Sequence, residues 1–167
     1  GSAGLFVQTG GTFNNADNHR IDVGNNGTGT YQLSGGVVTN LRYLSVGRSS
    51  GTGTAHITGD DASIHVAEFS IHNAASKMKV APDSGGISVV NASGNITLNG
   101  TLEVDLANRT TTADLVLIDY GGTRTGQFAA TNILTQFWSA DIEYDDVGKQ
   151  VKLINISPPR GSIYRFR

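Results

Sequence analysis

An internal repeat with a period of about 23 to 25 residues constrains the fold of this chain more than any other feature. The stretch GLFVQTGGTFNNADNHRIDVGNNGTGT is followed by YQLSGGVVTNLRYLSVGRSSGTGT and then by AHITGDDASIHVAEFSIHN, which has the same plan. The glycine pair Gly10-Gly11 aligns with Gly35-Gly36 and then with Gly59-Asp60. A repeat of this length is typical of solenoids, in which each coil contacts only its neighbours.

Hydrophobic side chains recur at every second position within each repeat, which predicts short strands with one buried face. Two sets of positions align between repeats: Phe6 and Gln8 with Tyr31 and Leu33 and with Ala55 and Ile57, and Ile21 and Val23 with Leu44 and Val46 and with Phe69 and Ile71. Coils stacked about 4.8 Å apart would bury these positions as apolar ladders. We therefore predict an all-β fold, a single-stranded parallel β-helix (β-solenoid). We expect it to be right-handed, with roughly six or seven coils from chain length divided by period.

The repeat weakens after Asn73, where short strands remain but their spacing changes. Residues 140–144 and 150–156 flank an Asp-Asp-Val-Gly turn, which predicts a hairpin. Residues 129–138 form the only segment in which we expect a helical turn. A solenoid needs a cap, because its terminal coil otherwise exposes a free strand edge.

These features predict one domain. We expect the β-solenoid to cover residues 1–156, with degenerate coils and a C-terminal hairpin cap from about residue 101. Residues 157–167 are interpreted as a tail or linker.

Composition argues against several functional classes. The net charge is −2 and there is no basic tract, so we expect no nucleic-acid partner. Cysteine is absent, which removes disulfides, thiol catalysis and Cys-based metal sites. No apolar run approaches membrane-spanning length, so no membrane partner is expected.

The string GTGTYQLSGGVVTNLRYLSVGRSSGTGT resembles the autotransporter-associated β-strand repeats of large bacterial surface and secreted proteins. The later stretch LEVDLANRTTTADLVLIDYGGTRTGQF is similar to the segment that ends such arrays in planctomycete-type secreted proteins. The resemblance implies an extracellular protein, secreted or at the cell surface, that is covalently linked to further domains. It specifies architecture rather than activity, because this scaffold serves in adhesins, spacers and carbohydrate-active enzymes. Some carbohydrate-binding modules are also β-helical.

The sequence offers no catalytic or metal-binding constellation. The acidic pairs Asp60-Asp61 and Asp145-Asp146 fall at predicted turns, where Asp caps backbone amides. The four histidines, at positions 19, 56, 65 and 72, lack a metal-ligand spacing such as HExxH. We therefore expect no enzyme activity, no cofactor and no metal.

One face of the predicted solenoid carries a repeating polar pattern. Outward positions beside the second buried ladder would form two adjacent rows: Arg20, Tyr43 and Glu68 in one, and Asp22, Ser45 and Ser70 in the other. An aromatic ring stacks on a sugar and polar groups bond to its hydroxyls, so these six residues are the candidate ligand-binding site. Tyr120, Trp138 and Tyr144 are alternative aromatic contacts, or they pack in the cap.

Three functional hypotheses follow. The first is a non-catalytic carbohydrate-binding module of a secreted bacterial polysaccharide-degrading protein, with a plant-type polysaccharide such as xylan or β-glucan as its partner. The second is a structural spacer or adhesin segment without glycan binding. The third is a polysaccharide lyase, which would need clustered carboxylates for calcium and a basic proton acceptor. No such cluster aligns between the repeats.

Overall fold

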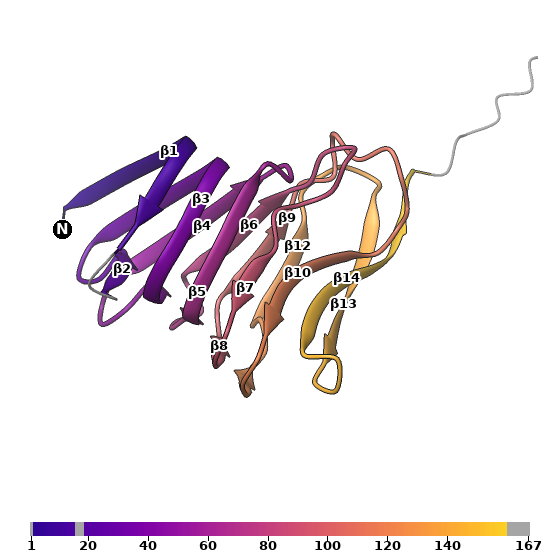
Figure 1. Ribbon diagram of the computed structural model, residues 1–167. Coiled ribbons are helices and arrows are strands. Elements are labelled where there is room, and N and C mark those ends of the chain that lie inside the picture. Colours follow the sequence, from indigo (N-terminus) through magenta and orange to yellow (C-terminus); the bar gives the residue numbers. More distant parts are fainter. Residues whose placement is uncertain (1, 16–18, 160–167) are drawn as a thin grey trace, which may run out of the picture.

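The computed structural model describes residues 2–15 and 19–159, and over these it is all-β, with 61% of the chain in strands and no helix. The strands stack as a parallel β-solenoid of about five turns, and Figure 1 shows the coils side by side from the indigo N-terminal end to the yellow C-terminal end. The predicted fold class is therefore confirmed. The number of turns is smaller than the six or seven expected, because the final strands form a hairpin instead of further coils.

The strands are β1 (Ala3–Asn14), β2 (Arg20–Val23), β3 (Thr28–Val46), β4 (Thr52–Thr58), β5 (Ala62–Ile71), β6 (Lys77–Ala81), β7 (Val90–Ala92), β8 (Ile96–Leu98), β9 (Thr101–Val104), β10 (Leu115–Tyr120), β11 (Arg124–Gly126), β12 (Ala130–Ile133), β13 (Ser139–Asp145) and β14 (Gln150–Ser157).

Parallel pairing arranges these strands in three ladders. The first ladder joins the start of β1 and β3 to β4, β6, β9 and β12. The second joins the end of β1 and the middle of β3 to the start of β5, then β7 and β10. The third joins β2 and the end of β3 to the end of β5, then β8 and β11.

The buried columns run along the solenoid axis as the repeat predicts. In the first ladder Phe6, Tyr31, Ala55, Met78 and Leu102 lie in register. All but Phe6 are buried, and Met78 and Leu102 have no exposed surface. Each coil covers the apolar face of the next, so the stack buries what one coil alone would leave in water.

The C-terminal end is closed by the predicted hairpin. β13 and β14 pair antiparallel, and β14 also pairs antiparallel with β10. Its side chains Val151, Leu153 and Ile156 are buried against the last coil. The hairpin therefore takes the place of a further coil on the second ladder, which completes the hydrogen bonding of that edge.

The expectation of a helical turn over residues 129–138 is wrong. β12 continues the first ladder instead, with Ile133 in register with the buried Val104. The β-branched residues of this segment fit an extended strand, and the ladder offers them partners. The tail or linker expected over 157–167 lies almost wholly outside the described residues, since the description ends at Pro159.

Candidate ligand-binding face

The third ladder brings together the two polar rows that the sequence predicts. Arg20 pairs with Tyr43, and Tyr43 pairs with Glu68 in the next coil. In the same way, Asp22 pairs with Ser45 and Ser45 with Ser70. The register derived from the repeat is therefore correct over the first three coils.

Two arginine side chains lie over the ring of Tyr43. The guanidinium carbon of Arg20 is 4.8 Å from the ring centroid, and that of Arg42 is 5.1 Å away. Guanidinium groups are attracted to aromatic faces at this distance. A sugar would therefore have to displace an arginine to stack on this ring, whereas the N–H donors of both arginines are placed to bond to hydroxyl groups.

The second row is closed to a ligand over most of its length. Ser45 is only 4% exposed. The Asp22 carboxylate, 17% exposed, pairs with Arg48 at 3.5 Å between Oδ2 and Nη1. Arg48 belongs to the turn after β3, which reaches back to this row. Alternation predicts an outward direction for Asp22 and Ser45, but Asp22 is paired with Arg48 and Ser45 is buried. Ser70 is half-buried.

A depression of about 440 Å³ that the sequence did not predict lies over the second ladder, beside the first row. One side carries a column of polar residues, since His65 pairs with Asn91 and Asn91 with Asp119. The depression is also lined by Asn40, Ala67 and Ala92, and we call it the axial groove. Arg42 and Glu68 follow the groove residues Leu41 and Ala67 in the chain, so the groove and the Arg20-Tyr43-Glu68 row adjoin.

Hydrogen bonds position the groove residues. Asn40, which has a positive φ of 55°, donates from Nδ2 to Asn14 Oδ1 at 2.9 Å. Asn91 donates to the backbone oxygen of Ile64 at 3.2 Å, and Gln150 donates to Asp119 Oδ2 at 3.1 Å. The polar wall is therefore held in place before any ligand arrives.

The alternating pattern of the sequence predicts that His65 faces outward. It does not predict that Asn91 and Asp119 align with His65. These two residues lie beyond Asn73, where the repeat fades and the coil spacing changes. A bulge in β3 between Val38 and Leu41 also shifts the register at the groove. The sequence alone therefore does not predict the axial groove.

Different elements carry the histidines His56 and His65 and the acidic pair Asp145-Asp146. His56 and His65 project from different ladders. The pKa values of His56 and His72 are lowered, chiefly because both side chains are partly buried. Within residues 2–15 and 19–159, no three His, Asp or Glu side chains form a group that could hold a metal ion. The pair Asp145-Asp146 lies at the hairpin turn, where Asp145 Oδ1 accepts from the backbone nitrogen of Gly148 at 2.7 Å.

Comparisons of the chain with protein families, with curated proteins and with solved structures find no match. The part of the chain that the structure describes contains no helix long and apolar enough to cross a membrane.

Proposed function

We propose that this solenoid is a non-catalytic module that binds a polysaccharide along the axial groove and the Arg20-Tyr43-Glu68 row. The observation that carries the proposal is the repetition of polar side chains once per coil along the groove, through His65, Asn91 and Asp119. Neighbouring coils lie about 4.8 Å apart, which is close to the advance of one sugar along an extended β-linked chain. Successive coils would therefore meet successive sugars.

The chemistry of the two walls suits hydroxyl groups. Asp119 and Glu68 supply carboxylate acceptors, and Arg20 and Arg42 supply donors. The amide of Asn91 and the imidazole of His65 lie on the same wall as Asp119. Charge-assisted hydrogen bonds of this kind are among the stronger polar contacts, and they give orientation without requiring a deep pocket. The expected ligand is an uncharged, extended polysaccharide of the plant cell wall, such as xylan or β-glucan.

A secreted, extracellular setting and covalent linkage to polysaccharide-degrading domains complete this proposal. They are supported by the resemblance of the first two coils to bacterial surface and secreted repeats. The alternative of a structural spacer is favoured by a different observation: β1 pairs with β3 along one edge, and no described strand pairs with its other edge. The two functions differ in one respect that can be measured, which is whether a glycan binds at all.

Affinity electrophoresis on gels containing xylan, mixed-linkage β-glucan or mannan tests the proposal. Retardation on at least one polymer is expected. His65→Ala and Glu68→Ala should each weaken binding about tenfold, the loss expected for one or two hydrogen bonds. His56→Ala is the matched control, because His56 lies in the same coil but projects from the first ladder. Migration that is unchanged on all three polymers would rule out binding to these polymers and favour the spacer.

A further inference from the structure

The two ends of the solenoid differ. The C-terminal end is closed by β13 and β14, as Figure 1 shows. At the other end, one edge of β1 pairs with β3, and no other described strand pairs with β1. The first coil therefore presents a row of backbone donors and acceptors along a strand of 12 residues.

This edge lacks the usual protection against pairing. Natural edge strands carry charged residues, proline or a short length, but Ala3–Asn14 contains neither a charged residue nor a proline. Its consecutive side chains Leu5, Phe6 and Val7 are 65%, 48% and 50% exposed. An edge of this kind is suited to pairing with a further strand.

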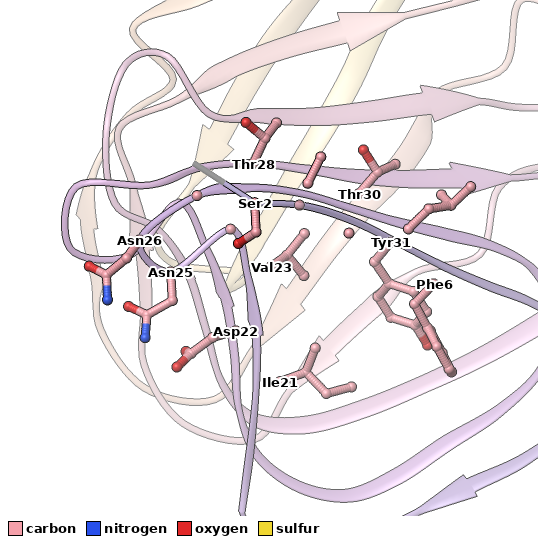
Figure 2. Close-up of a pocket in the computed structure, with 16 residues that line it drawn as sticks. Ser2, Phe6, Ile21, Asp22, Val23, Asn25, Asn26, Thr28, Thr30 and Tyr31 are labelled. Atoms are coloured by element: carbon pink, nitrogen blue, oxygen red, sulfur yellow. The ribbon is translucent and has the colours of Figure 1, made fainter.

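The apolar interior is also open at this end. Phe6 stands in the buried column, with its ring centroid 5.2 Å from that of Tyr31 and 6.1 Å from that of Phe13, yet it stays 48% exposed. A depression of about 480 Å³ extends from Phe6 across Ile21 and Val23, and Figure 2 shows these side chains around it. In the residues lining it, two buried acceptor atoms, Oδ1 of Asp22 and Oδ1 of Asn25, have no donor.

The glycines of the first coil indicate what kind of partner would fit. A Cβ at Gly29 would lie 2.3 Å from the backbone nitrogen of Gly24, and a Cβ at Gly35 would lie 2.7 Å from the carbonyl oxygen of Thr9. Gly29 is therefore required by the turn that ends the first coil, and Gly35 by the strand of that coil that lies beside it. Gly4 is in register with Gly29, and Gly10 adjoins Thr9, the partner of Gly35. A Cβ at Gly4 or Gly10 would meet no atom within 4 Å.

We propose that the N-terminal end accepts one further parallel coil of the same repeat, which pairs with β1 and β2 and covers Phe6 and Ile21. A parallel coil continues the interface already present between the first two coils. With its strand and its final turn it would crowd Gly4 and Gly10 as the first coil crowds Gly29 and Gly35. Edge-to-edge pairing with a second copy would reverse the strand direction, and the glycine pattern gives no reason for it. This inference does not depend on glycan binding.

A lengthened chain tests the proposal directly. A copy of residues 28–51 is placed before Ala3. Ala3 is in register with Thr28, and Thr28 is in register with Thr52, so the copy ends one residue before the position that Ala3 occupies in the repeat. The added coil should slow hydrogen exchange of the β1 amides by on the order of tenfold or more and raise Tm. The control is the same addition with aspartate in place of Tyr31 and Leu33 in the copy only, at the positions that would lie over Phe6 and Gln8. It should give neither effect.

Glycine substitutions provide a second measurement. Gly10→Ala should leave Tm unchanged in the present chain and lower it in the lengthened chain, whereas Gly35→Ala should lower Tm in both. Equal exchange of the β1 amides with and without the added coil would overturn the proposal. So would a dimer of the present chain, seen by light scattering, whose β1 amides lose their protection on dilution, because the occupant of the edge would then be a second copy.

Discussion

The guanidinium of Arg124 holds the carboxylate of Asp146 through two hydrogen bonds, of 2.8 Å from Nε to Oδ1 and 2.7 Å from Nη2 to Oδ2. Arg124 stands in register with the buried Ile96, so it occupies the position where the third ladder would place its next apolar side chain. Its guanidinium also lies 4.7 Å from the ring centroid of Tyr144, and the hydroxyl of Tyr120 donates to Asp146 at 2.6 Å. The hairpin thus ends the core with a polar cluster.

This cluster predicts a dependence of stability on acid. The hydrogen bonds from Arg124 are the main cause that lowers the pKa of Asp146 to about 2, and the hydrogen bond from Tyr120 is the next. A carboxylate with a lowered folded-state pKa stabilises the fold above its unfolded pKa of about 4, and this contribution is lost as the pH falls towards 2. Tm measured between pH 6 and pH 2 should therefore fall at the acid end.

Substitution of Asp146 tests whether this carboxylate, and not another, causes the loss of stability in acid. Asp146→Asn should have a lower Tm than the parent at pH 6, and the difference between the two proteins should shrink as the pH approaches 2. Asp61→Asn, which changes an exposed carboxylate beside the start of β5, is the control and should follow the parent at every pH. A constant difference between Asp146→Asn and the parent from pH 6 to pH 2 would contradict this account.

A second prediction concerns the polar pair inside the first coils. The hydroxyl of Tyr31 donates to Gln8 Oε1 at 2.7 Å, and Gln8 Nε2 donates to the carbonyl oxygen of Val37 at 3.2 Å. Tyr31→Phe leaves a buried acceptor without its donor and should cost about 1–3 kcal/mol in the free energy of unfolding.

The double variant tests the reason for that loss. Gln8 is in register with Leu33, so Gln8→Leu continues the apolar column. Combined with Tyr31→Phe, it should recover most of the stability, because both polar partners are then replaced together. Urea unfolding of the two single variants and the double variant measures this coupling, and strictly additive losses would refute it.

Asn73 supplies a third prediction, because its side chain joins two turns. Its Nδ2 donates to the carbonyl oxygens of Gly47 at 2.6 Å and Gly51 at 2.8 Å, while its Oδ1 accepts from the backbone nitrogen of Ser76 at 3.0 Å. Asn73→Ala should cost about 2–3 kcal/mol, since several partners lose their bonds at once. The matched control is Asn99→Ala, which removes one exposed bond to His72 and should cost less than about 1 kcal/mol. Equal losses in denaturant unfolding would show that the turn does not depend on Asn73.

The repeat makes much of this fold predictable from sequence. The buried columns through Tyr31, Leu44 and Phe69 and the register of Arg20 with Tyr43 follow directly from aligning the first three coils. The hairpin is predictable too, because its turn residues separate two alternating segments. Each of these features depends on local pattern or on residues one period apart.

The candidate site is less predictable, because its exposure depends on turns rather than on alternation. Asp22 is paired with Arg48 from the following turn. Tyr43 is covered in part by Arg42, which follows the register shift between Val38 and Leu41 in β3. The axial groove needs Asp119 beside Asn91, in coils whose sequences no longer resemble the first two. Contacts of this kind join residues that no sequence period relates.

The last prediction tests whether the aligned columns carry the stability. Phe69 has no exposed surface and lies between Leu44 and Ile96 of the neighbouring coils. Phe69→Ala should cost about 3–5 kcal/mol in the free energy of unfolding, through lost burial and the cavity left behind. Phe137→Ala is the matched control, because Phe137 is 76% exposed in the turn before β13 and should change stability by less than about 1 kcal/mol. A solenoid transmits such a loss to its neighbours, because each coil is stabilised chiefly by the coils beside it. Hydrogen exchange in Phe69→Ala should therefore speed up first in β5 and in its partners β3 and β8, and faster exchange confined to the distant β13 would contradict this account.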